Sequence, residues 1–123
     1  MAQTSNHAHH AGKVDAELID FLHAKIDTFV KWDLIRYFHD NPHARDTADN
    51  IAQYTGRDMQ AVEAALAGLV AADILREQRV SKVRVYDLAE DPYTRDLIHR
   101  FVLACDDREF RVMAIYHVIE AQG

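Results

Sequence analysis

Residues 46–90 read DTADNIAQYTGRDMQAVEAALAGLVAADILREQRVSKVRVYDLAE, and this stretch decides the fold. Thr47 can cap a first short helix, because its hydroxyl can accept a hydrogen bond from a free N–H of the first turn. Gly56 can adopt the left-handed conformation that ends this helix. Asp58 can then cap a second helix. We therefore predict a helix-turn-helix over residues 47–73.

The second helix of this stretch has one apolar face. Its apolar residues recur with the 3.6-residue period of an amphipathic helix, and they are Val62, Ala65, Leu66, Leu69 and Val70. The helix should end near Ala72, and Asp73 follows it. Aspartate is one of the few residue types besides glycine that tolerate a positive φ. Beyond Asp73 the period changes to 2, which predicts a two-stranded wing over 74–88 with residues 79–82 as its polar tip.

A Thr-capped helix, a Thr-Gly turn, a second helix with a Leu-x-x-Leu stripe, a turn residue and a hairpin follow one another in this stretch. This order resembles the winged helix-turn-helix of MarR- and ArsR-type bacterial regulators, over roughly residues 28–90. The resemblance implies a mainly α fold with a small β-hairpin wing, flanked here by extra N- and C-terminal helices. It also implies a DNA-binding transcriptional regulator. In that fold the second helix, here 58–72, enters the major groove, and the wing contacts the backbone or the minor groove.

The resemblance also implies which side chains would contact DNA. Gln60 could read adenine, and Glu63 could accept a hydrogen bond from a cytosine amino group. Cations on the wing would contact phosphates. The implied set of DNA-binding residues is Thr47, Arg57, Gln60, Glu63, Arg79, Lys82 and Arg84.

The distribution of charge leaves a second interpretation open. The chain has a net charge of −6, and residues 58–75 contain neither Lys nor Arg. Residues 76–86 carry four cations against Glu77, so DNA affinity would depend on this basic wing. The alternative is a non-catalytic adaptor that uses the same helix to bind another protein instead of DNA. Its uncharged exposed face would be Met59, Ala64, Ala67 and Ala71.

Length and composition predict one globular domain. The chain has 123 residues, of which 49% are hydrophobic and 28% charged. We expect a disordered tail over 1–13 and a single domain over 14–123. No apolar run is long enough to span a membrane, and no secretory signal is visible. The single cysteine, Cys105, excludes an internal disulfide and fits a reducing cytoplasm.

Motifs for catalysis are missing from the sequence. It contains no glycine-rich phosphate loop, no serine nucleophile elbow and no helical metal-binding His spacing, so we expect no enzyme, no cofactor and no metal. Cys105 lies on an apolar stripe, which favours a buried, unreactive thiol. Two histidine groups keep a metal alternative open, although a solvated tail and a helix end explain them more simply: His7, His9 and His10, and His39 with His43.

The flanking segments are helical by their apolar periodicity. Residues 14–40 carry two apolar stripes and form either one helix buried on two sides or two helices broken near Thr28. Residues 91–121 form C-terminal helices that Asp91 can cap. The charged run 106–109 either separates two helices or forms one exposed turn of a single helix.

These flanking helices carry more apolar surface than a small winged helix needs to bury, which favours a homodimer over a monomer. An isologous pair is the commonest way to cover such a surface. The expected interface residues are Leu18, Phe21, Leu22, Phe101, Phe110, Met113 and Tyr116. Aromatic residues on helices more often belong to the core, but they could also line a ligand pocket. The candidates for lining such a pocket are Trp32, Tyr116 and His117.

Overall fold

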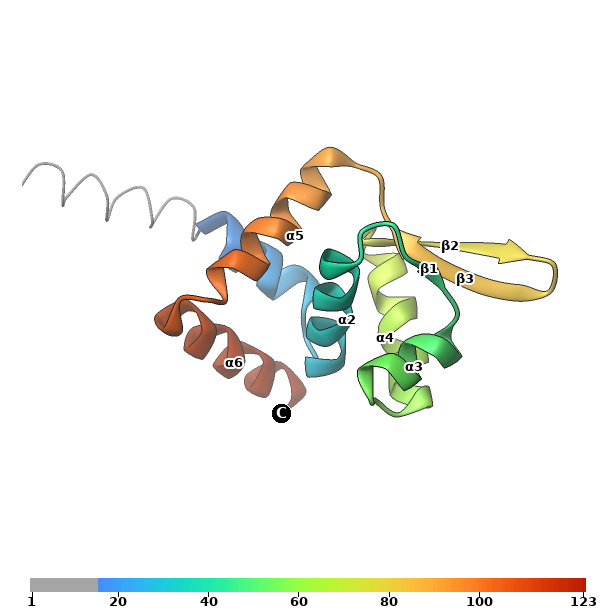
Figure 1. Ribbon diagram of the computed structural model, residues 1–123. Coiled ribbons are helices and arrows are strands. Elements are labelled where there is room, and N and C mark those ends of the chain that lie inside the picture. The colour runs from blue at the N-terminus through green and yellow to red at the C-terminus, as the bar shows by residue number, and fades with distance from the viewer. Residues whose placement is uncertain (1–15) are drawn as a thin grey trace, which may run out of the picture.

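The computed structural model describes residues 16–123, so the expected tail over 1–13 and its three histidines lie outside the described residues. A first helix spans residues 16–25. The elements that follow are α2 (Phe29–Asp40), β1 (Arg45–Asp46), α3 (Ala48–Thr55), α4 (Met59–Ala71), β2 (Leu75–Val80), β3 (Val83–Leu88), α5 (Pro92–Ala104) and α6 (Arg108–Gln122). The order from α2 to β3 is that of a winged helix, which confirms the predicted fold class (Figure 1).

Local hydrogen bonds define the helix-turn-helix as predicted. The hydroxyl of Thr47 accepts from the third residue of its helix, and Asp58 caps α4 in the same way. Gly56 ends α3 with φ 71°, in the left-handed region. Asp73 ends α4 with φ 63°. Its N–H and that of Ile74 donate to carbonyls of the last turn, which closes α4 in a Schellman-type turn.

Each of the two flanking segments, 14–40 and 91–121, contains two separate helices instead of one long helix. Thr28 caps α2, where its hydroxyl accepts from the Lys31 N–H at 3.1 Å. Asp107 caps α6, where its carboxylate accepts from the Phe110 N–H at 3.0 Å. The charged run therefore separates α5 from α6 instead of forming one turn of a longer helix.

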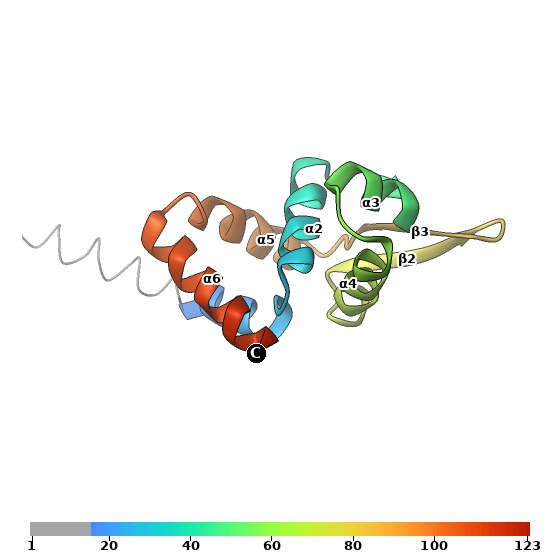
Figure 2. The same ribbon diagram turned by 90° about the horizontal axis from the view of Figure 1, so that it is seen from below.

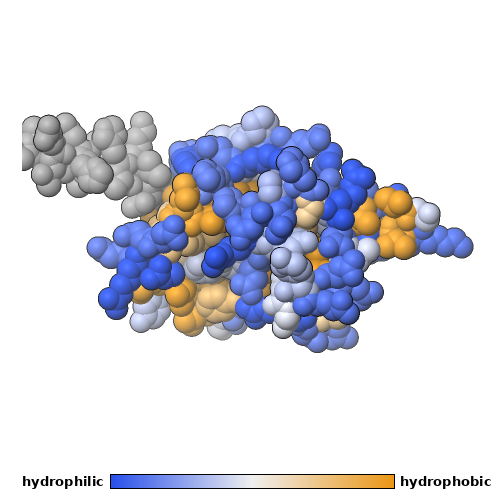
Figure 3. Space-filling model, in the orientation of Figure 1, coloured by the Kyte–Doolittle hydropathy of each residue, from blue (hydrophilic) through white to orange (hydrophobic). Residues whose placement is uncertain are grey.

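The sheet has three antiparallel strands in the order β1-β3-β2. β1 has two residues and pairs only with Tyr86 and Asp87 of β3, so the outer part of the hairpin projects from the molecule (Figure 1). Its turn is tighter than predicted, because Val80 and Val83 are paired and only two residues lie between them. Figure 3 shows an apolar patch on this hairpin beside a hydrophilic tip.

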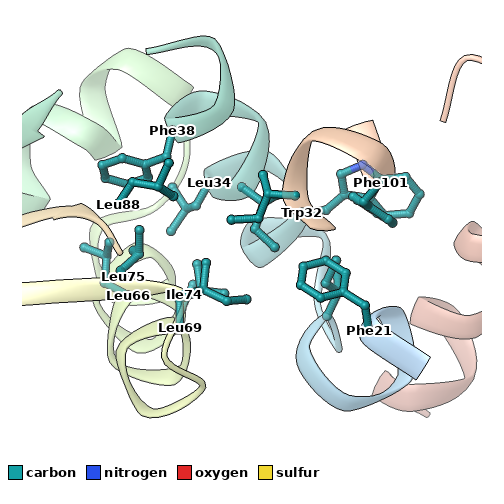
Figure 4. Packing of buried hydrophobic residues seen from close by; sticks show 14 of the residues in the cluster. Phe21, Trp32, Leu34, Phe38, Leu66, Leu69, Ile74, Leu75, Leu88 and Phe101 are labelled. Atoms are coloured by element: carbon teal, nitrogen blue, oxygen red, sulfur yellow. The ribbon is translucent and has the colours of Figure 1, made fainter. Parts of the chain in front are cut away.

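Helices lie on both sides of α2 (Figure 2), and buried side chains fill the space between them (Figure 4). On one side Leu34 packs with Leu66 and Leu69 of α4 and with the base of the wing. On the other side Trp32 packs with Phe101 of α5 and with the helix of residues 16–25. Among the helices of residues 16–123, none is both long and apolar enough to cross a membrane.

The expected dimer interface is corrected by this packing. Five of its residues are 6% exposed or less, because α5, α6 and residues 16–25 cover one another within a single chain: Leu18, Phe21, Leu22, Phe101 and Phe110. Met113 is half-buried, and Tyr116 is exposed. Most of the apolar residues that we expected in a dimer interface are therefore buried within a single chain.

Candidate nucleic-acid interface

The solvent-facing side of α4 carries few polar groups. Gln60 and Glu63 are exposed at its N-terminal end, as the predicted DNA contacts require. The same face continues with exposed Ala64, Ala67 and Ala71. Met59, which we expected on this face, is half-buried against the core. The exposed face of α4 thus offers two polar side chains and no positive charge.

Thr47 has a structural role at the start of α3. Its Oγ1 accepts a hydrogen bond from the Asn50 N–H at 3.3 Å. Asp46 Oδ1 in turn accepts from the Thr47 N–H at 2.9 Å and from Asn50 Nδ2 at 2.8 Å. The Thr47 hydroxyl proton can still be donated to a phosphate, but a carboxylate lies beside it.

Arg57 forms an ion pair with Asp33, a partner that the sequence did not predict. Its Nε and Nη2 both lie 2.7 Å from Asp33 Oδ2, on α2. The two side chains remain 38% and 40% exposed, so water screens the pair. Arg57 is thus turned toward α2, and a contact with DNA would compete with Asp33.

The wing tip carries the free cations of this face. Arg79 and Lys82 are exposed, and neither has an ion-pair partner within residues 16–123. Arg84 is 59% exposed, and its Nε lies 4.0 Å from Glu77 Oε2, which is a loose pair. Ser81 has φ 61° at the turn between the strands. The tip therefore presents two unpaired charges and one weakly paired charge.

The root of the wing, where Arg76 meets Asp87, carries no net charge, although residues 76–86 as a whole contain more cations than acids. Arg76 Nε and Nη2 donate to the two carboxylate oxygens of Asp87 at 3.2 and 2.6 Å. Glu90 lies 3.4 Å from the same guanidinium, and Arg45 lies 4.0 Å from Asp87. The hydrogen bond with Asp87 raises the pKa of Arg76. The basic character of residues 76–86 is therefore confined to the tip.

His39 has a partner other than the one considered from the sequence. Its Nε2 lies 2.9 Å from Nδ1 of His99 on α5, and its Nδ1 lies 3.0 Å from Asp40 Oδ1. The contact with His99 joins α2 to α5, and His43 takes no part in it. Within residues 16–123, no group of three or more His, Cys, Asp or Glu side chains is arranged to hold a metal ion.

The three aromatic residues considered for a ligand pocket do not come together. Trp32 is buried in the core at 8% exposure, whereas Tyr116 is 63% exposed. His117 Nε2 lies 3.1 Å from the carbonyl oxygen of Ile26, and its ring lies 4.4 Å from that of His23. Trp32 borders a cleft with Phe29 and Ile115.

Comparison with known proteins shows the fold. No protein-family model matches the chain, and no curated protein matches it. A solved structure from Methanosarcina mazei Go1, described as a possible transcriptional regulator, is similar with a TM-score of 0.53 at 17% identity. The similarity covers 80% of this chain and 84% of that one. The similarity thus shows a shared overall fold.

Proposed function

We propose that the protein is a DNA-binding transcriptional regulator whose wing supplies most of the affinity. The observation that carries this proposal is the pair of unpaired cations, Arg79 and Lys82, at a projecting tip. They lie on the hairpin that follows α4, whose first turn exposes Gln60 and Glu63. The regulator-like neighbour supports the same role. The proposed role involves binding without catalysis, and it belongs in the cytoplasm, where the single cysteine would stay reduced.

Contacts with phosphates supply a large part of the affinity of a protein for DNA. Neutralising phosphates releases counterions, and each contact adds about 0.9 to the slope of log affinity against log salt. Because α4 carries no cation, the groove helix adds base contacts but little electrostatic attraction. With Arg57 paired to Asp33, the wing tip is the part of this face that can supply phosphate contacts.

The test is fluorescence anisotropy with generic duplex DNA at ~50 mM and ~200 mM salt, where phosphate contacts are visible. The wild type should bind and should weaken steeply as salt rises. The double variant Arg79→Gln/Lys82→Gln should bind more weakly, with a slope lower by about 2. The matched control Arg36→Gln/Arg108→Gln removes two exposed cations of α2 and α6 and should bind like the wild type.

Equal losses in the two double variants would mean that only net charge matters, against a role of the wing. No binding at ~50 mM salt by the folded protein would favour the second candidate, a protein-binding adaptor. One observation favours that candidate specifically, namely the exposed alanine face formed by Ala64, Ala67 and Ala71. Asp58 and Glu63 at the N-terminal end of the same helix are acidic, which repels phosphates.

We further propose that two chains pair through the outer face of α6. Val112, Tyr116 and Ile119 lie at helical spacings of four and three residues and are 40%, 63% and 50% exposed. They replace the buried residues that we expected in the interface. A dimer would carry two wings and would therefore make twice as many phosphate contacts as one chain. A single wing offers only a few such contacts.

Light scattering tests this pairing. The wild type should have the mass of a dimer, and Tyr116→Lys should have that of a monomer, because a charge would be buried without a partner. The matched control Tyr54→Lys changes a tyrosine of α3 that is 73% exposed, and it should remain a dimer. A monomeric wild type, or a dimeric Tyr116→Lys variant, would contradict the proposed interface.

A further inference from the structure

A cleft of about 240 Å³ opens between α2, the turn before α4, and α6. Figure 2 shows α2 between α6 on one side and α3 on the other. Residues from three distant segments thus meet in one place. We call its apolar lining residues the floor and its charged lining residues the rim, and α2 and α6 contribute to both.

The floor is formed by Phe29, Trp32 and Ile115. The rings of Phe29 and Trp32 are stacked, with centroids 6.0 Å apart and planes inclined by 26°. Phe29 and Ile115 are only half-buried, so part of this apolar surface remains in contact with water. An apolar group placed on the floor would remove that surface from water, which is favourable.

The rim carries three arginines and one acid. Arg57 is paired with Asp33, so these two charges offset each other. Arg36 of α2 and Arg111 of α6 complete the rim. Neither of these two guanidiniums has a carboxylate partner within residues 16–123, although Arg111 Nη1 donates to the Cys105 carbonyl oxygen at 2.7 Å. Two positive charges are thus left uncompensated here in a chain whose net charge is −6.

The nearby thiol does not compensate these charges. Burial raises the pKa of Cys105 to about 11, although Arg36 and Arg111 act in the opposite direction. The thiol is therefore neutral near pH 7, although Cys105 is half-buried and not fully buried as we expected. An external anion would find both guanidiniums available, and guanidinium matches carboxylate and phosphate oxygens in geometry.

We propose that this cleft binds a small organic anion that has a short apolar body. The anionic head, a carboxylate or a phosphate monoester, lies between Arg36 and Arg111, and the body lies on Phe29, Trp32 and Ile115. The volume is below that of pockets for drug-sized ligands, so the occupant is small.

Trp32 is the only tryptophan of the chain and borders the cleft, so its fluorescence reports on occupancy. Hexanoate and hexyl phosphate are suitable probes because neither absorbs where tryptophan does. At least one of them should change the fluorescence saturably, and their relative affinities show which head group is preferred. Hexanamide, which lacks the charge, and acetate, which lacks the body, should produce no saturable change at the same concentrations.

Arg36→Gln should weaken binding of the preferred probe about tenfold, as expected for the loss of one charge-assisted hydrogen bond. Arg111→Gln should weaken it similarly, and it provides an independent readout if the first variant is unstable. Arg108→Gln, an exposed position of α6 outside the cleft, should bind like the wild type.

Three results would overturn the proposal: no saturable response of the folded protein to either anion, equal binding of hexanamide, or unchanged binding in both cleft variants. The test contains no DNA, so its outcome is independent of the proposed function.

Discussion

Replacing Phe101 with alanine should lower the free energy of unfolding by about 3–5 kcal/mol, the usual cost of deleting a large buried aromatic side chain. Phe101 has no exposed surface. Its ring lies 5.8 Å from that of Phe21, 5.6 Å from Trp32 and 5.9 Å from Phe110. It therefore joins the first helix, α2 and α6, and its loss would leave a cavity bordered by all three.

Urea denaturation at one fixed protein concentration measures this effect, with far-UV circular dichroism and Trp32 fluorescence as two probes. The two transitions should coincide if the C-terminal helices unfold together with the winged helix. The control Tyr54→Ala removes an aromatic that is 73% exposed and should cost less than about 1 kcal/mol. A similarly small cost for Phe101→Ala would mean that α5 and α6 do not pack on α2 as described.

Leu66→Ala should cost about 2–5 kcal/mol, because the site is fully buried and the surrounding side chains can only partly collapse. Leu66 lies on the other side of α2 from Phe101, among Leu34, Leu69 and the base of the wing (Figure 4). The large effect thus tests the packing of α4 independently of the C-terminal helices.

The same urea titration measures it, and Leu103→Ala is the matched control. Leu103 is also a helical leucine but is 52% exposed, so its truncation should change the stability little. A loss below ~1 kcal/mol for Leu66→Ala would contradict its placement in the core.

The boundaries of the helix-turn-helix could be predicted because short-range chemistry determines them. Thr47 and Asp58 bond to N–H groups three residues away, and Gly56 and Asp73 have the positive φ that their residue types tolerate. Such signals lie within a few residues of one another. β1 has no such signal, since two residues cannot show an alternating pattern, and the pairing that defines it comes from residues 86–87.

The interface residues could not be predicted from apolar periodicity alone. An apolar stripe shows that a face is covered, but not whether the same chain or a second one covers it. Leu18 and Phe110 are covered by their own chain, whereas Tyr116, given the same role from the sequence, is exposed.

Electrostatic partners also depend on the fold, because they are far apart in sequence. Asp33 and Arg57 are 24 residues apart, so counting charges by segment could not pair them. Residues 13–40 and 87–123 each contain more acidic than basic side chains, so a count by segment also misses the cleft that Arg36 and Arg111 border. Conversely, counting charges over residues 76–86 overestimates the positive charge of the wing, because Asp87 neutralises Arg76 at its root.

The short β1 strand has a consequence for solubility. Because β1 covers only Tyr86 and Asp87, the outer edge of β3 beyond them is open, and so is the edge of β2, within the described part of the chain. Open strand edges are templates for pairing with another hairpin, and charged side chains are a common protection against such aggregation. Val80 and Val83, half-exposed near the tip, would favour such contact. We therefore expect the like charges of Arg79 and Lys82 beside them to oppose edge-to-edge pairing of two wings.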